Sequence, residues 1–202
     1  MRLRRKFHRL INRSIESIAN TVKLEKNFFK LFDLPQQFNT DAIVVKRRFR
    51  ELQRNFHPDR YIGKSPQEQR LAVQFSAHIN TAMTTLNDPV LRAEHLLSLQ
   101  GIEIDHQHST IKDNAFLFQQ MEFREALEQA SIEKDISALT VILAEVDDDF
   151  QACQASFADQ ITDIESHQPS PLGDSLCAEV GKMHFYQSLS HEINAIIYSL
   201  SA

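Results

Sequence analysis

The chain has 202 residues and a net charge of −5, with four glycines, six prolines and no tryptophan. This composition is typical of a helical protein, and the length suits one domain or two small ones. Its two cysteines, Cys153 and Cys177, form no Cys-x-x-Cys pair, and no apolar run approaches the roughly twenty residues of a membrane span. We therefore expect no disulfide framework and no membrane span, and the cysteine count excludes a zinc site made of cysteines.

Residues 1–26 form a basic extension with eight Lys or Arg residues against two acids, whereas residues 101–202 have four against eighteen. Apolar residues recur at helical spacing in this extension, at Leu3, Phe7, Leu10, Ile11, Ile15, Ile18 and Val22. The pattern suits an interfacial membrane helix, a nucleic-acid arm or an organellar transit peptide. The alternative is a loosely ordered terminus without a role, or the product of an upstream start codon.

A basic amphipathic helix is predicted before a His-Pro-Asp tripeptide. Its apolar side holds Val45, Phe49, Leu52 and Phe56, and its opposite side holds Arg47, Arg50 and Arg54. The helix cannot continue through His57, because Pro58 lacks an N–H and disfavours the helical conformation of the residue before it. His57-Pro58-Asp59 is therefore expected on a loop, exposed to a partner.

Helices are also predicted on both sides of this basic helix. Asn27 to Pro35 reads as a short apolar helix, and Thr40 or Asp41 is the expected N-cap of the basic helix. A later helix carries Leu71, Phe75, Ile79, Ala82 or Met83, and Leu86, and ends at Asn87-Asp88-Pro89. The basic helix and this later one should run in opposite directions, with His-Pro-Asp at the connecting end.

A short helix over residues 90–99 should join the first part of the chain to the second, with Gly101 as its C-cap. Residues 101–109 read as a linker that contains His106 and His108. A single His-x-His in a linker is weak support for a metal site, so we expect no bound metal.

The remaining residues predict three helices. The first covers Asp113 to Ala130, and Pro169 and Pro171 should end the second, leaving Asp174 or Ser175 to cap a third that runs towards Leu200. Apolar residues of the second helix alternate spacings of three and four, as along a bundle seam, at Ile136, Leu139, Leu143, Val146, Phe150, Cys153, Phe157, Ile161 and Ile164. Cys153 is thus expected as a small buried hydrophobe.

The first of these three helices has more apolar residues than one buried face needs. Phe116, Phe123, Leu127 and Ala130 share a face, while Leu117, Phe118 and Met121 point elsewhere, among Glu122, Glu125 and Glu128. The outward group either contacts another helix or the linker, or it is an interaction surface with a polar rim.

Three groups of residues carry a resemblance to a known family. They are Phe29-x-Leu31-Phe32-x-Leu34, His57-Pro58-Asp59, and Ile79-Asn80-x-Ala82-x-x-x-Leu86-x-Asp88-Pro89-x-x-Arg92. Together they resemble a J-domain, the module that activates DnaK-type chaperones. Two positions depart from that pattern: Met83 replaces a common aromatic residue, and Arg60 replaces the usual lysine. Neither departure removes a charge or an apolar contact.

The continuation narrows the resemblance to the HscB family, the J-proteins of bacterial iron–sulfur cluster assembly. It rests on Arg92-Ala93-Glu94-His95-Leu96-Leu97-Ser98-Leu99 with Gly101, on Phe116-Leu117, and on Glu122-x-Arg124-Glu125. The resemblance implies an all-α, cytoplasmic co-chaperone. A J-domain with its joining helix would occupy residues 27–100, and a three-helix domain that binds a scaffold protein would occupy residues 110–202.

The family also implies partners and site residues. The J-domain would bind a DnaK-type chaperone, HscA, and stimulate its ATP hydrolysis through His57, Pro58, Asp59, Arg47, Arg50 and Arg54. The C-terminal domain would bind the scaffold IscU through Leu117, Phe118, Met121, Glu122, Glu125 and Phe185. Gln129 stands where the family might extend the acidic rim with a glutamate. No cofactor is implied.

Three other functions are weighed against this one. A general J-protein for other clients should lack the outward patch on residues 117–121. A nucleic-acid-binding protein would use the basic extension, but the acidic second half would oppose an extended duplex. A hydrolase using His57 and Asp59 would need an enclosed pocket, which an exposed loop does not provide. We therefore expect a protein without enzymatic chemistry and without a nucleic-acid or membrane partner.

Overall fold

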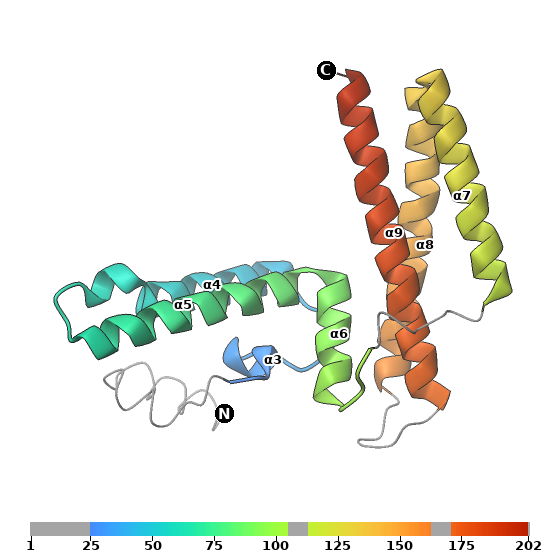
Figure 1. Ribbon diagram of the computed structural model, residues 1–202. Coiled ribbons are helices and arrows are strands. Elements are labelled where there is room, and N and C mark those ends of the chain that lie inside the picture. The colour runs from blue at the N-terminus through green and yellow to red at the C-terminus, as the bar shows by residue number, and fades with distance from the viewer. Residues whose placement is uncertain (1–24, 105–112, 163–170, 202) are drawn as a thin grey trace. The chain divides into compact units, whose positions relative to one another are not determined.

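The computed structural model describes residues 25–104, 113–162 and 171–201, and every regular element in these ranges is a helix (Figure 1). The all-α prediction is confirmed. The chain divides into two compact units, residues 1–99 and residues 100–202. The hypotheses about residues 1–24, and about His106 and His108, lie outside the described residues. No helix in the described ranges is long and apolar enough to cross a membrane.

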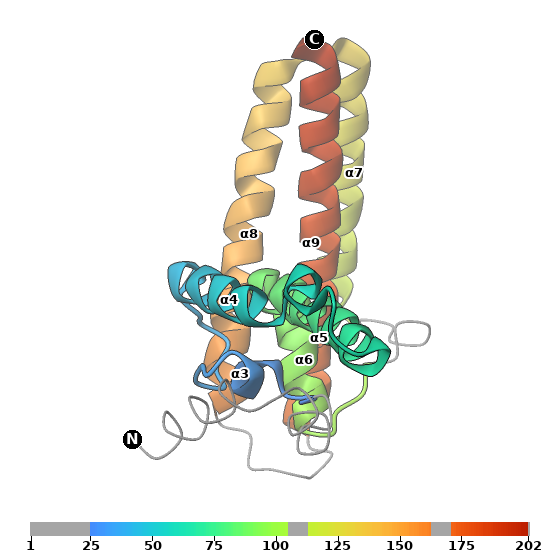
Figure 2. The ribbon, with the colours of Figure 1, turned by 90° about the vertical axis from the view of Figure 1, so that its left-hand side faces the viewer.

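The first unit is built on an antiparallel helix pair. Its elements are α3 (Phe28–Leu31), α4 (Ala42–Phe56), the 3₁₀ helix η1 (Pro58–Tyr61), α5 (Pro66–Asn87) and α6 (Pro89–Leu99). Helices α4 and α5 lie side by side, and η1 follows α4 at one end of the pair (Figure 1, Figure 2). The predicted hairpin is thus confirmed.

Side-chain caps explain where these helices begin. Of the two predicted caps of α4, Asp41 is used, and its carboxylate accepts hydrogen bonds from the backbone N–H groups of Ile43 (2.8 Å) and Val44 (3.4 Å). A capping box between Ser65 and Glu68 starts α5. Asp88 ends α5, and its side chain accepts a bond from the N–H of Val90 at 2.8 Å at the start of α6.

The core of the first unit lies between α4, α5, α6 and α3. Its largest fully buried side chains are Phe29, Phe32, Val45, Ile79, Leu86 and Leu97. Phe56 stacks on Phe75 with ring centroids 5.2 Å apart, which closes the apolar contact between α4 and α5 near the His-Pro-Asp end. The predicted apolar face of α4 is therefore the face that packs on α5.

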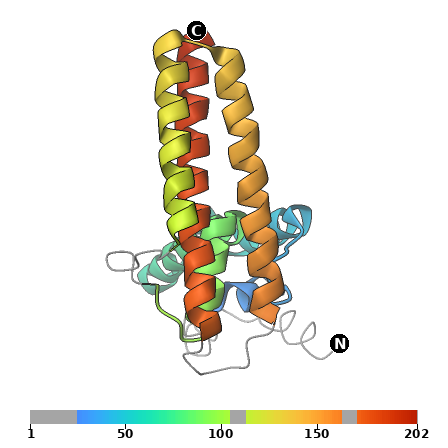
Figure 3. The same cartoon turned by 90° about the vertical axis from the view of Figure 1, so that its right-hand side faces the viewer.

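The second unit has three long helices, α7 (Asn114–Glu133), α8 (Ile136–Thr162) and α9 (Pro171–Ser201), which lie lengthwise beside one another (Figure 3). Lys134, in the left-handed conformation with φ 54°, ends α7. Asp135 then accepts a hydrogen bond from the N–H of Ala138 and starts α8. The three-helix bundle expected from the sequence is confirmed.

Two details of the predicted bundle were wrong. Helix α9 begins at Pro171, not after Asp174 or Ser175, because proline is well accommodated in the first turn of a helix, where its missing N–H has no partner to lose. On α8 the buried residue is Ile142, whereas Leu143 is half-buried and Ile136 is 39% exposed. An α-helix has 3.6 residues per turn, so a strict seven-residue pattern drifts off the buried face.

Most of the predicted core is confirmed. Leu139, Val146, Cys153 and Phe157 are buried on α8, and Phe116, Phe123, Leu127 and Ala130 are buried on α7. Burial raises the pKa of the Cys153 thiol to about 12, so that it stays protonated and apolar, as expected for a structural cysteine.

Candidate partner-binding surfaces

The His-Pro-Asp tripeptide forms a tight turn at the end of α4. His57 is the C-cap of α4 and the N-cap of η1, with φ −63° and ψ 129°, and Pro58 opens η1. The ring Nδ1 of His57 accepts a hydrogen bond from the backbone N–H of Asp59 at 3.3 Å. The side chains of His57 and Asp59 are 52% and 77% exposed, so the turn presents both to solvent.

Arg60 and Tyr61, which follow the tripeptide, hold this turn against the end of α4. The guanidinium of Arg60 donates to the backbone oxygen of Arg54 at 2.8 Å, and the hydroxyl of Tyr61 donates to that of Asn55 at 3.1 Å. Both oxygens belong to the last turn of α4, where backbone carbonyls lack helical partners. This role of Arg60 and Tyr61 was not predicted from the sequence. Donors two and three residues beyond the helix-ending His-Pro pair would have been the signal.

The three predicted arginines form an exposed basic face. Arg47, Arg50 and Arg54 are exposed on α4, opposite the face that packs on α5. Arg48, between them in sequence, instead forms ion pairs with Asp33 at 2.8 Å and with Glu51 at 3.1 Å. Arg48 therefore supports the fold, whereas the other three arginines of α4 face solvent on the helix that ends at His57.

Polar contacts fix the orientation of this surface relative to α5. The side-chain amide of Gln53 donates to the amide oxygen of Asn80 at 2.6 Å, and the hydroxyl of Ser76 donates to the amide oxygen of Gln53 at 3.3 Å. Together with the Phe56–Phe75 stack, they tie the last turns of α4 to α5. The turn and the arginines are thus displayed from a rigid helix pair.

The second unit exposes an apolar patch on α7. Leu117 is 43% exposed, Phe118 68% and Met121 67%, which are high values for large apolar side chains. Glu122 and Glu125 are exposed beside them. The prediction that these apolar side chains point outward is confirmed. Of the alternatives considered from the sequence, burial against another helix of the bundle is wrong, and contact with the linker concerns residues that lie mostly outside the described ranges.

Phe185 of α9 borders the same patch. It is half-buried, its ring meets that of Phe116 edge-on with centroids 5.5 Å apart, and the guanidinium of Arg124 lies 6.0 Å from its centroid. Arg124 also pairs with Glu192 of α9 at 2.5 Å. Because Arg124 lies one helical turn beyond Met121, these contacts place Phe185 at the edge of the α7 patch.

The described residues contain no group of three or more His, Cys, Asp or Glu side chains that could hold a metal ion. His57 Nδ1 and Asp59 Oδ2 lie 3.4 Å apart, yet both side chains are largely exposed. An acid–base pair on such an exposed turn has no pocket around it that would enclose a substrate. The surface around His57 on the first unit exposes charged side chains, and the α7 patch on the second unit exposes apolar side chains.

Comparisons with known proteins match both units. Residues 112–194 match the family model described as the HSCB C-terminal oligomerisation domain. The co-chaperone protein HscB homolog of Shewanella oneidensis is 41% identical over 174 residues, which cover 84% of this chain and 96% of that protein. The homolog from Shewanella baltica strain OS195 is 38% identical over 172 residues, with the same coverage.

Solved structures share the fold. The chaperone HscB from Vibrio cholerae has 35% identity and a TM-score of 0.75, covering 86% of this chain and 99% of that one. The human co-chaperone protein HscB has a TM-score of 0.77 at 24% identity, covering 86% of this chain and 83% of that one, and supports the fold alone.

A helical hairpin that displays His-Pro-Asp at its connecting end, together with a separate helical unit, defines a J-protein, a class of co-chaperones. Both units of this chain have their counterparts in the same relatives. The chain belongs to the HscB family of co-chaperones.

Proposed function

We propose that this protein is a co-chaperone of iron–sulfur cluster assembly, which binds the scaffold IscU and delivers it to the DnaK-type chaperone HscA. The observation that carries the proposal is the presence of two exposed surfaces of different chemistry, one on each compact unit. A protein that brings a client to a chaperone needs one surface for each of them.

The chaperone surface consists of His57, Pro58, Asp59, Arg47, Arg50 and Arg54. The exposed arginines attract an acidic chaperone surface and orient the encounter, because charges at the rim of an interface mainly accelerate association. The rigid turn then presents the His57 ring and the Asp59 carboxylate without a cost in ordering. Stimulation of ATP hydrolysis should therefore weaken as salt screens the arginines.

The client surface consists of Leu117, Phe118, Met121, Glu122, Glu125 and Phe185. Exposed apolar side chains with a polar rim are typical of interaction sites, and the apolar part supplies most of the affinity. Glu122 and Glu125 would pair with basic residues of the client and fix its orientation. Gln129 adds no charge to this rim.

The deciding experiment separates the two surfaces. The triple variant Leu117→Ala/Met121→Ala/Phe185→Ala should lose on the order of 2–4 kcal/mol of scaffold binding, about 30-fold or more in affinity, when IscU is titrated calorimetrically. Its basal stimulation of the HscA ATPase should persist, while the additional stimulation caused by IscU disappears. Unchanged affinity with intact helical content would mean that the client binds elsewhere.

The complementary variant tests the chaperone surface. His57→Gln should abolish ATPase stimulation and change thermal unfolding little, because the side chain is 52% exposed and its one hydrogen bond, to the Asp59 N–H, lies at the surface. His191→Gln, an exposed histidine of α9, is the matched control and should behave as the wild type. If His57→Gln still stimulated the ATPase, the J-domain mechanism would be wrong.

A further inference from the structure

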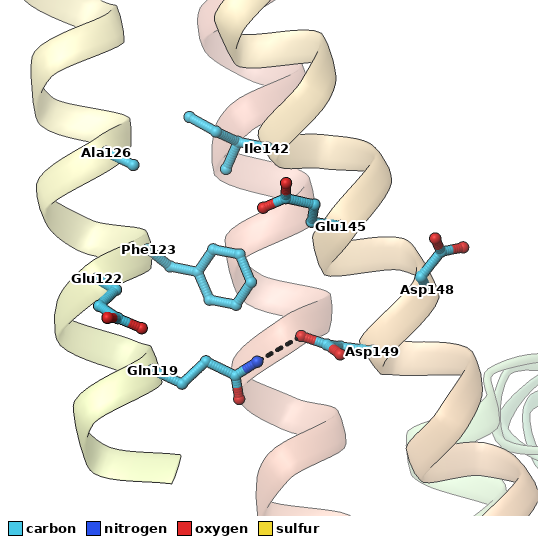
Figure 4. Close-up of a pocket in the computed structure, with 8 residues that line it drawn as sticks. All are labelled: Gln119, Glu122, Phe123, Ala126, Ile142, Glu145, Asp148 and Asp149. Atoms are coloured by element: carbon cyan, nitrogen blue, oxygen red, sulfur yellow. Dashed lines mark hydrogen bonds between the residues drawn. The ribbon is translucent and has the colours of Figure 1, made fainter. Parts of the chain in front are cut away.

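A groove between α7 and α8 borders the client surface. It has a volume of about 490 Å³, and Phe123 and Ile142, each 7% exposed, form its floor (Figure 4). Glu122 lines it from α7, and Glu145 and Asp148 line it from α8. The groove thus combines a small apolar floor with acidic walls, and it suits a ligand that carries apolar and basic side chains together.

Hydrogen bonds hold the two walls of the groove in place. The Gln119 amide of α7 donates to Asp149 of α8 at 2.7 Å, and Gln119 in turn accepts a bond from the Tyr186 hydroxyl at 2.8 Å. Further along α7 the lining residue is Ala126, which is exposed and leaves room above the floor. The groove is therefore formed before a ligand arrives, so that binding costs little ordering of the protein.

The acids of the groove lack cationic partners. Within the described part of the second unit, no ion pair reaches Glu122, Glu145 or Asp148. The cations of Arg124 and Lys182 are paired with acids elsewhere on the bundle. Glu145 and Asp148 are three residues apart on α8, where like charges repel one another. A basic ligand would relieve that repulsion.

The client surface by itself is too small for a stable complex. It has six residues, whereas specific protein interfaces use about 20–30 residues on each side. The contact must therefore extend from α7 onto a neighbouring helix. Towards α9 the charge of Arg124 is neutralised by Glu192, but towards α8 the carboxylates are free. A client that pairs with Glu122 and Glu125 is basic, so its charge favours the α8 side.

We propose that the client also occupies the groove between α7 and α8, with a segment that carries an apolar side chain between basic ones. The apolar side chain lies over Ala126 and contacts Phe123 and Ile142, and the basic side chains pair with Glu145 and Asp148. Glu122 lines the groove and belongs to the client surface, so the two contacts are continuous. The inference rests on the proposed function, which identifies the client as IscU.

A charge reversal tests the acidic wall. When IscU is titrated calorimetrically into the full chain, Glu145→Lys should weaken binding at least about fivefold, because it replaces an attraction by a repulsion. The difference from the wild type should shrink as salt screens the charges. Asp159→Lys is the matched control, because it makes the same charge change at another exposed acid of α8, outside the groove, and should bind IscU as the wild type does.

A second variant tests the space above the floor. Ala126→Trp should fill the groove and weaken IscU binding at high salt as well, because it removes room and leaves the charge unchanged. Ala144→Trp is its control, since Ala144 is an exposed alanine of α8 that does not line the groove. Circular dichroism should show the same helical content in all four variants.

The outcomes separate this inference from the proposed function. Failure of the wild type to bind IscU would refute the proposed function, and the inference with it. If the wild type binds and each groove variant matches its control, the groove proposal is overturned and the client surface on α7 stands. A loss in Glu145→Lys alone would indicate attraction at a distance, and would also overturn docking. If Glu145→Lys instead reduced self-association in sedimentation and left IscU binding unchanged, the groove would belong to a second copy of the chain.

Discussion

At the scale of single residues, the side chains that support the His-Pro-Asp turn are as informative as the tripeptide. The Tyr61 hydroxyl and the Arg60 guanidinium each bind a carbonyl of the last turn of α4. Burial raises the pKa of Tyr61, so the phenol stays protonated and remains a donor at neutral pH. The conformation of the turn thus depends on residues that need not touch a partner.

Tyr61→Phe should lower the free energy of unfolding of the first unit by about 1 kcal/mol, because it removes one partly buried hydrogen bond. Chemical denaturation followed by circular dichroism measures this loss. Tyr198→Phe is the matched control, since Tyr198 is 78% exposed, and should change stability little. Equal effects of the two substitutions would show that the bond to Asn55 is unimportant.

A second residue-scale feature is the contact of α3 with two histidines. The Nε2 atom of His95 accepts a hydrogen bond from the backbone N–H of Phe28 at 3.1 Å, and the two rings stack with centroids 4.4 Å apart. The Nε2 atom of His78 lies 2.9 Å from the backbone oxygen of Glu25. Burial lowers the pKa of His95, because the charged ring is poorly solvated there.

The direction of the His95 shift predicts a pH dependence. A lowered pKa in the folded state means that the unfolded chain binds the proton more tightly, so the contribution of His95 is complete above about pH 6.5 and is lost as the pH falls below it. Protonation also removes the acceptor of the Phe28 N–H. We expect the denaturation midpoint of the first unit to decrease as the pH is lowered from 7.5 to 5.0. The decrease should be smaller in His95→Gln. Identical pH profiles would contradict this assignment.

At the scale of elements, a chain of hydrogen bonds joins all three helices of the bundle. The Tyr186 hydroxyl of α9 donates to the Gln119 amide oxygen of α7 at 2.8 Å, and the Gln119 amide donates to Asp149 of α8 at 2.7 Å. Burial, followed by the negative charge of Asp149, raises the pKa of Tyr186, so its hydroxyl stays a donor. Gln119 therefore positions α7, which carries the proposed client surface.

Gln119→Leu should destabilise the second unit by roughly 1–3 kcal/mol, because it leaves the buried Tyr186 hydroxyl without its acceptor. The double variant Gln119→Leu/Tyr186→Phe should recover part of that loss, since both partners are then apolar. Urea denaturation of the single and double variants measures the difference. A double variant less stable than Gln119→Leu would show that the two residues do not act as a pair.

At the scale of the whole molecule, each unit has its own apolar core. Phe29 is fully buried in the first unit and Phe157 in the second, each at 0% exposure. Units with separate cores generally unfold by themselves. The proposed chaperone and client surfaces lie on different units, so damage to one core should spare the surface on the other.

Phe157→Ala should cost about 3–5 kcal/mol in the second unit, because it leaves a cavity in a packed core. Scaffold binding should then fail at a temperature where basal ATPase stimulation persists. Phe29→Ala should have the reverse effect. Thermal unfolding measures the loss of stability in each variant, and scaffold binding and ATPase stimulation measure the loss of each function. Loss of ATPase stimulation in Phe157→Ala, at a temperature where the first unit is folded, would refute the separation.

Periodicity and chain-breaking residues determined much of this protein from sequence alone. Pro58 ends α4 at Phe56 in any fold, because its ring and missing N–H act locally. The buried and outward faces of α7 also followed from spacing, since a side chain's direction on a helix depends only on its position. The hairpin, the bundle and the exposure of Leu117, Phe118 and Met121 could be predicted for this reason.

Contacts between distant residues were decided by the tertiary structure. The Tyr186–Gln119–Asp149 chain joins three helices, and no spacing along the sequence indicates that these residues meet. The same holds for Phe185 against Arg124 and for the groove between Phe123 and Ile142. Which seam residue of α8 is buried, Ile142 or Leu143, depends on where α7 and α9 approach it. Local geometry gives each helix its faces, but only packing decides which faces meet.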